Sequence, residues 1–311
     1  MRILAQRLLA TLPVMAVVAL IVFLLIHLSP GDPAALIAGV LASTDDIAKL
    51  RTSLGLDQPL WRQFVIWAGR LAHGDLGTSI FTQVPVTELL AQRLEPTLSI
   101  ALLTMLISLA LAIPLGTLAA YRAGSWVDRL VMLFAVLAFS MPVFLIGYLL
   151  IYTFSIQLQW LPVQGYVRLS EGVGPWLRNL LLPCVNLALV YMALLTRMTR
   201  ATVLEVLQED YIRTARAKGL GVLAVLGHAL RNAAIPIATT AGVGIALLIG
   251  GVVVTETVFA IPGVGRLVID SVQRHDYPVI QSVLLISAGV YVLINLLIDL
   301  SYGLFDPRIR A

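Results

Sequence analysis

The stretch TLSIALLTMLISLALAIPLGTLAA, Thr97–Ala120, decides the fold class of this chain. It contains no Asp, Glu, Lys or Arg, and it exceeds the about 20 residues that a helix needs to cross the hydrocarbon of a bilayer. Five further uncharged runs have roughly this spanning length: Leu8–Leu28, Leu130–Leu158, Asn179–Thr196, Ala233–Thr255 and Val279–Ile298. The strands of a membrane β-barrel give short alternating segments instead. We therefore predict an all-α polytopic membrane protein with six transmembrane helices.

The composition agrees with a membrane protein. Hydrophobic residues make up 59% of the 311 positions, charged residues only 12%, and the mean hydropathy is +0.94, outside the range of soluble globular domains. The isoelectric point near 9.4 does not indicate nucleic-acid binding, because the basic residues are distributed as determinants of topology. The single cysteine, Cys184, excludes an intramolecular disulfide. The first run follows Arg2 and Arg7, and we interpret it as an uncleaved span because it is too long for a signal-peptide core.

The distribution of Lys and Arg predicts that both termini face the cytoplasm, since short cytoplasmic loops are enriched in these residues. With the N-terminus inside, the cytoplasmic segments hold twelve of them: Arg2, Arg7, Arg122, Arg129, Arg197, Arg200, Arg213, Arg216, Lys218, Arg231, Arg308 and Arg310. The two short outer loops hold four: Arg168, Arg178, Arg266 and Arg274. In this count Arg200 is one topology cation among several.

The predicted spans divide the chain into three parts. Residues 1–28 form the N-terminus and first span, residues 29–96 a long extracytoplasmic loop, and residues 97–311 a core with the other five spans. Within the core, the segment from about 200 to 235 forms a cytoplasmic loop.

The long outer loop contains two short helical patterns. TDDIAKLRTSLGL has Thr44 and Asp45 as possible caps and ends at Gly55. WRQFVIWAGRL places Trp61 and Phe64 on one apolar face. The second pattern is typical of a surface helix on the membrane or on the other spans, and alternatively of a docking surface for an external partner.

The segment DYIRTARAKGL, Asp210–Leu220, predicts a short, self-capped helix between two spans. Glu209 or Asp210 can cap its N-terminus, and Lys218 lies near the end where a cation is favourable. Gly219 and Gly221 then end it.

This short helix has the properties of a docking element. Ala215 and Gly219 are four residues apart, which predicts a flat face with almost no side chain, and Arg213 and Arg216 share the neighbouring face. A flat patch beside guanidinium groups fits a groove on another protein that presents carboxylates. The alternative is that the cations only set the membrane topology.

The chain lacks the sequence patterns of an enzyme that uses nucleotide or metal. Neither of its two lysines, Lys49 and Lys218, lies in a GxxxxGK[ST] loop. The four histidines are scattered, with no HExxH and no pairing to Cys184: His27, His73, His228 and His275. We predict that the chain binds no cofactor or metal, and that any energy comes from another subunit.

DYIRTARAKGL resembles the cytoplasmic "EAA" loop of binding-protein-dependent ABC importer permeases, in the branch for dipeptides, oligopeptides and nickel. The resemblance covers nearly the whole chain and is to the B-type member of a permease pair. The other motifs that carry it, in order, are SPGDP, LGLDQPL, HGDLGTS, SMPVF, ALRNAAIP, ETVFAIPGVGRL, DYPVIQ and DPRIR.

The resemblance implies that this loop is a helix that couples the permease to a cytoplasmic ATPase. Its residues would be Asp210, Tyr211, Arg213, Thr214, Ala215, Arg216, Lys218 and Gly219. Arg213-Thr214-Ala215 occupies the EAA position, so an arginine replaces the glutamate, and Pro236 comes later than the usual closing Ile-x-Leu-Pro. The partners implied are a second homologous permease, two ABC ATPases that use ATP, an extracytoplasmic solute-binding protein and membrane lipid, in a bacterial inner membrane.

Four residues are candidates for the translocation path or its gate: Ser140, Met141, Asn186 and Glu256. Glu256 lies at a span end, where a structural role is an equal alternative. The resemblance implies peptides as the substrate, with nickel chelates, glutathione or another small solute as alternatives. A secondary transporter driven by an ion gradient is a remote alternative, because such proteins carry mid-span charges and often two related halves.

Overall fold

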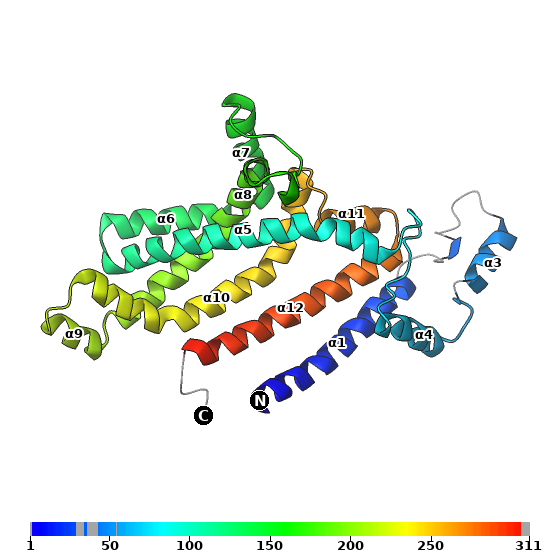
Figure 1. Ribbon diagram of the computed structural model, residues 1–311, viewed down its shortest axis with the longest axis horizontal. Helices are drawn as coiled ribbons and strands as arrows, with labels where there is room; N and C mark the ends of the chain where they lie inside the picture. The colour runs from blue at the N-terminus through cyan, green and yellow to red at the C-terminus, as the bar shows by residue number, and fades with distance from the viewer. Residues whose placement is uncertain (1, 29–33, 36–42, 54, 306–311) are drawn as a thin grey trace. The chain divides into compact units, whose positions relative to one another are not determined.

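The chain is helical in the computed structural model, which describes residues 2–28, 34–35, 43–53 and 55–305 (Figure 1). The helices are α1 Arg2–Leu28, α3 Thr44–Ser53, α4 Leu60–Ala72, α5 Val86–Tyr121, α6 Trp126–Ser140, α7 Val143–Leu150, the π-helix η1 Ile151–Gln157, the 3-10 helix η2 Leu169–Glu171, α8 Val173–Val206, α9 Asp210–Ala217, α10 Val222–Val258, α11 Val264–Gln273 and α12 Tyr277–Phe305. In the described part of the chain no β-strand occurs, only one isolated bridge. The predicted all-α class is confirmed.

The structure agrees with the six membrane crossings predicted from the sequence, but one of these crossings is bent and not straight. Five helices are long and apolar enough to cross a bilayer, and α6 with α7–η1 passes the same test as one broken crossing. The two parts of this pair meet at 103°. The predicted run Leu130–Leu158 is therefore two helices and not one straight span.

Proline explains where this run breaks. Pro142 follows α6, and the steric clash of its ring with the preceding residue disfavours the helical conformation there. Met141 accordingly has φ −83° and ψ 134°, an extended backbone. Ser140 and Met141, predicted as path or gate residues, thus lie at the bend itself.

The contacts divide the chain into two units, Met1–Leu94 with Leu267–Leu293, and Glu95–Arg266 with Ile294–Ala311. In the second unit, α8 packs against α6, α7 and α10. Because it has helices around it, two thirds of its most apolar window (67%) is buried. Its buried side chains form a core with α10 and the loop that follows it: Leu180, Leu187, Tyr191, Leu248, Val252 and Phe259.

In the first unit, α4 packs on α1 through aromatic rings. The ring centroid of Phe23 lies 5.3 Å from that of Phe64 and 5.6 Å from that of Trp67. Trp61, which the sequence places on the same face as Phe64, is instead 69% exposed. The apolar face of α4 is thus divided between α1 and the surface.

Two details of the segment between α1 and α5 refine the sequence predictions. Helix α3 is capped by Ser43, whose Oγ accepts from the backbone N–H of Asp46 at 3.2 Å. The predicted caps Thr44 and Asp45 are wrong, because both lie inside the helix. Gly55, predicted to end this segment, has φ +68° and makes the turn that follows.

Candidate functional site

Helix α9 has one fully buried side chain, Ile212, which packs it onto its unit. Ile212 packs in a cluster built from the end of α5, the last turns of α8 and the first turns of α10: Ala120, Val203, Leu207, Val225, Ala229, Ala233 and Ile237. The remaining side chains of α9 are exposed, except Ala215, which is half-buried. Ile212 thus packs α9 onto the ends of α8 and α10.

The N-terminus of α9 follows the prediction in position but not in bonding. Glu209 occupies the N-cap, but its side chain makes no capping hydrogen bond. Asp210 in the first turn pairs instead with Arg213, at 3.1 Å between Oδ1 and Nη1. Both side chains are largely exposed, 94% for Asp210 and 73% for Arg213, so this pair adds little stability.

The C-terminus of α9 has the geometry of a Schellman motif. Gly219 N–H donates to the Arg216 carbonyl at 2.9 Å, and Leu220 N–H donates to the Ala215 carbonyl at 3.2 Å. This motif needs a left-handed residue after the helix, and Gly219 has φ +79°. The predicted stop at Gly219 matches this geometry. The predicted flat face is wrong, because Gly219 lies beyond the last helical residue, Ala217, and shares no helical face with Ala215.

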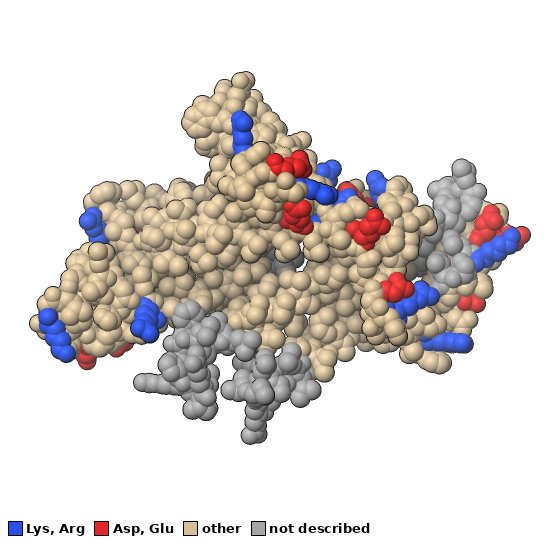
Figure 2. All heavy atoms as spheres, in the orientation of Figure 1, with Lys and Arg blue, Asp and Glu red and all other residues tan. Residues whose placement is uncertain are grey.

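The exposed surface of α9 is basic and has an apolar edge. Arg213, Arg216 and Lys218 are all exposed, and Figure 2 shows Lys and Arg side chains over the part of the surface that carries α9. At the start of α10, Val222 and Leu223 are 48% and 86% exposed. Cations beside exposed aliphatic side chains fit a partner groove with carboxylates at its rim.

The sequence analysis did not single out Val222 and Leu223. On α10 the buried positions Val225, Ala229 and Ala233 recur every four residues. This spacing could have assigned Leu223, two residues before Val225, to the opposite, exposed face, whereas it puts Val222, three residues before Val225, on the buried side. On the other side, Tyr211 Oη accepts a hydrogen bond from Asn232 Nδ2, which adds a second attachment of α9 to α10.

Asn186, a predicted path residue, lies at the junction of α7, α8 and α10. It is fully buried, and its Nδ2 donates to Thr255 Oγ1 at 3.3 Å. A Cβ added at Gly147 on α7 would lie 3.3 Å from this Nδ2, so only glycine lets α7 approach so closely without adjustment. Asn186 Oδ1 has no hydrogen-bond partner among the described residues.

Glu256, another predicted path residue, is fully buried and hydrogen-bonded within the chain. Its Oε1 accepts from Thr97 Oγ1 at 2.6 Å, and its Oε2 accepts from Arg266 N–H at 2.9 Å. Thr97 Oγ1 in turn accepts from Val264 N–H at 2.8 Å. The carboxylate thus joins α10, α5 and the N-terminus of α11, where the helix dipole favours a negative charge.

The candidate residues form two groups in the structure. Asn186 bonds Thr255, the residue before Glu256 in α10, but the carboxylate of Glu256 has its own partners, Thr97 and Arg266. Ser140 and Met141 lie at the bend between α6 and α7, the helix whose Gly147 approaches Asn186. Of the residues that the structure describes, no group of three or more His, Cys, Asp or Glu could hold a metal ion.

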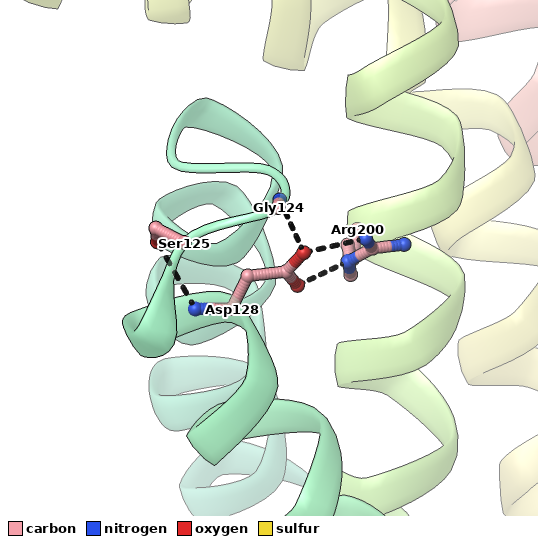
Figure 3. Close-up of polar contacts among 4 residues, drawn as sticks. All are labelled: Gly124, Ser125, Asp128 and Arg200. Carbon is pink, nitrogen blue, oxygen red and sulfur yellow. Dashed lines mark hydrogen bonds and ion pairs between the residues drawn. The ribbon is translucent and has the colours of Figure 1, made fainter.

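An ion pair between Asp128 and Arg200 was missed by the sequence analysis, which interpreted Arg200 as a topology cation (Figure 3). Arg200 Nε donates to Asp128 Oδ1 at 2.5 Å, and Nη2 donates to Oδ2 at 2.7 Å. Gly124 N–H donates to Oδ2 at 3.0 Å, and Ser125 Oγ accepts from Asp128 N–H at 3.4 Å as the N-cap of α6. The spacing of Ser125 and Asp128 is that of a helix cap and could have located this start.

Comparisons with known proteins agree with this architecture. Residues 112–311 match the family model described as "Binding-protein-dependent transport system inner membrane component", and residues 1–101 match the model of the N-terminal part of such membrane components. A probable peptide ABC transporter permease of Sinorhizobium fredii is 54% identical over 306 residues, which is 98% of each chain. A putative peptide transport system permease of Brucella abortus is 44% identical, again over 98% of each chain.

Two further similarities concern a glutathione permease and a solved structure. The glutathione transport system permease GsiC of Escherichia coli K12 is 42% identical over 98% of this chain and 97% of its own. The solved structure is an inward-facing form of the MetNI methionine ABC transporter, with a TM-score of 0.57, 18% identity and coverage of 71% of this chain and 97% of that chain. At this identity the likeness shows a shared fold.

Proposed function

Since this chain belongs to the family of binding-protein-dependent transport system inner membrane components, we propose that it forms half of the translocation path of an ATP-driven importer of peptides. It is a multi-pass permease subunit of a bacterial inner membrane and not an enzyme, because ATP hydrolysis in such transporters takes place in separate subunits. A second permease would complete the path, and two ATPases and a solute-binding protein would complete the importer.

The observation that carries the proposal is the form of α9. It is a two-turn helix with a defined end, a single buried anchor at Ile212 and an exposed basic surface. As the coupling helix, it would lie in a groove of one ATPase, with Arg213, Arg216 and Lys218 toward carboxylates of that groove. Closure of the ATPases would displace α9 and, through the packing around Ile212, the ends of α8 and α10.

The path is proposed farther along the same helices, away from α9. Asn186 on α8 is buried beside α7, which begins just after the bend at Ser140 and Met141, and Glu256 is buried near the end of α10. A movement of α8 and α10 would change the packing around Asn186. We place the gate there, with residues 29–96 outside the membrane, residues 97–311 as the core, and both termini in the cytoplasm.

Peptides are favoured as the substrate by the relatives. Those that are 54% and 44% identical are named for peptides, and the glutathione permease, at 42%, is named for a tripeptide. Nickel chelates and other small solutes remain the alternative cargo. A coupling helix of this form disfavours a transporter that is driven by an ion gradient.

The test is uptake by the reconstituted importer, with the second permease, the ATPases and the binding protein in liposomes. In the double variant Arg213→Glu, Arg216→Glu, ATP-dependent uptake of labelled peptide should fall at least about tenfold, because reversing a buried interfacial charge costs roughly 2–5 kcal/mol. Arg122→Glu, an exposed cation at the end of α5, serves as the control. Wild-type uptake and ATPase binding in the double variant would contradict the proposed role of α9.

A further inference from the structure

The ion pair between Asp128 and Arg200 joins the first turn of α6 to the last part of α8 (Figure 3). Arg200 lies six residues before Val206, the end of α8, and α9 begins at Asp210. We infer that this pair is the link through which α6 follows α8 when α9 is displaced, so that Asp128 and Arg200 are positioning residues of the transport cycle. The inference rests on the proposed function of α9.

The geometry of the pair makes it a rigid link. Both carboxylate oxygens of Asp128 are bound by the guanidinium of Arg200, and Gly124 N–H binds Oδ2 as well. The side chain of Asp128 is 6% exposed and that of Arg200 is 26% exposed, so little water competes for these bonds. A two-point contact between planar groups fixes orientation as well as distance. The pair therefore resists both separation and sliding of the two helices.

The apolar contact between α6 and α8 would not give this resistance by itself. It is built from small side chains, Ala135 and Ala138 on α6 against Ala193 on α8, with Leu189 partly buried beside them. Small side chains let the two backbones approach closely but give no directional contact, and packed helices can slide past one another in small shear motions. In the described part of the chain, Asp128–Arg200 is the only ion pair between these two helices. A second contact joins the same helices, because the guanidinium of Arg197 on α8 lies 5.6 Å from the ring centroid of Phe139 on α6. That contact does not fix orientation as the two-point pair does, so the pair is the more rigid of the two links.

Helix α6 connects this pair to the proposed gate. It has 15 residues and is therefore about 22 Å long, with Asp128 at one end and Ser140 at the other. Beyond the bend, α7 packs on Asn186 and Val258 through Gly147. If α6 follows α8, the displacement of α9 reaches the bend from two sides, through α8 directly and through α6.

A purely structural role of the pair would have different consequences, and the ratio of transport to ATP hydrolysis separates the two. Loss of a structural contact lowers the amount of assembled importer and its thermal midpoint, but leaves the substrate moved per ATP unchanged. Loss of a mechanical link leaves ATP hydrolysis in place and lowers the substrate moved per ATP. The readout is therefore this ratio, measured on equal amounts of assembled complex.

The variants are Arg200→Met, Arg200→Lys and the exchange of both charges, Asp128→Arg with Arg200→Asp. In Arg200→Met we expect at least about a tenfold fall in substrate moved per ATP, because the two-point contact that makes α6 follow α8 is lost. Arg200→Lys keeps the charge but loses the two-point contact, so the fall should be smaller. The charge exchange should recover part of the ratio. Arg129→Gln, the exposed neighbour of Asp128, should leave it unchanged.

A second measurement tests the connection between α6 and α8 directly, without measuring transport. Spin labels at Arg129→Cys on α6 and Ala201→Cys on α8, in a Cys184→Ser background, report the distance between the helices in the complete importer. With the ion pair intact, this distance should be the same with and without ATP. In Arg200→Met the label distances with and without ATP should differ, or their distributions should broaden. If that variant does not assemble, the same measurement is made on Arg200→Lys.

The outcomes separate this inference from the proposed function. If the wild-type importer shows no ATP-dependent uptake, the proposed function is overturned and the inference falls with it. If wild-type uptake is normal and Arg200→Met keeps the wild-type ratio and an unchanged label distance, only the inference is overturned. A lower thermal midpoint with a normal ratio also overturns it, since that result defines a structural contact.

Discussion

Gly219 and Gly263 are glycines for two different physical reasons. Gly219 has φ +79°, a conformation that other residues rarely adopt, while a Cβ added there would meet no atom within 4 Å. Gly263 has no such backbone angle, but a Cβ there would lie 2.0 Å from Glu256 Oε1. At Gly219 the backbone conformation requires a glycine, and at Gly263 the lack of space for a side chain requires one.

These constraints predict different costs for the same substitution. Gly219→Ala should cost about 1–2 kcal/mol, the strain of a left-handed residue with a side chain. Gly263→Ala should cost more, roughly 3 kcal/mol, because it overpacks the buried Glu256 carboxylate and disrupts its bond to Arg266. Thermal unfolding in detergent measures both. Gly227→Ala, inside α10 with open space around it, is the control and should not lower the midpoint.

At the scale of single elements, the packing of α9 onto its unit rests mainly on its one buried side chain, Ile212. Ile212→Ala should cost about 2–5 kcal/mol of local stability, because it leaves a cavity in the cluster that anchors the helix. Hydrogen exchange of the backbone from residue 209 to 220 should become faster, while exchange within α8 changes little. Thr214→Ala, on the exposed side of α9, is the matched control. Equal protection in wild type and Ile212→Ala would mean that other contacts hold α9.

The long helices could be predicted from the sequence because length and lack of charge are properties of a continuous run. The sequence did not show that α5 starts as early as Val86, since a helix can continue beyond the hydrocarbon. The break in the third run was also hidden: Pro114, Pro183 and Pro236 lie inside continuous helices, and only at Pro142 does the chain turn. Which proline breaks a helix depends on the packing around it.

The site was predictable to the extent that its residues are close in sequence. Asp210–Gly219 carries its own C-terminal glycine and cations, so the short helix and its end could be predicted. The partners of Glu256 could not be, because Thr97 is 159 residues away. The same holds for Asp128 and Arg200, 72 residues apart, for which no local pattern exists.

At the scale of the whole molecule, the prediction is the orientation in the membrane. In a Cys184→Ser background, an impermeant thiol reagent should label Ser170→Cys in intact cells but should label Gly221→Cys only after the membrane is opened. Both positions are exposed, so access to the reagent depends on the side of the membrane. The physical reason is the excess of cations in the segments assigned to the cytoplasm. Labelling of Gly221→Cys in intact cells would reverse the orientation.

The 103° bend between α6 and α7 has a consequence for solvation. Where a helix ends, its last four carbonyl groups have no partner within the helix, and here these belong to the residues up to Ser140. Hydrocarbon cannot bind such groups, and each left bare in lipid costs several kcal/mol. Ser140 is exposed on this chain, so lipid alone cannot be what covers it. If the bend lies within the hydrocarbon, as the proposed function requires, water or polar groups of a partner would have to reach it, and hydration there would trace an aqueous passage.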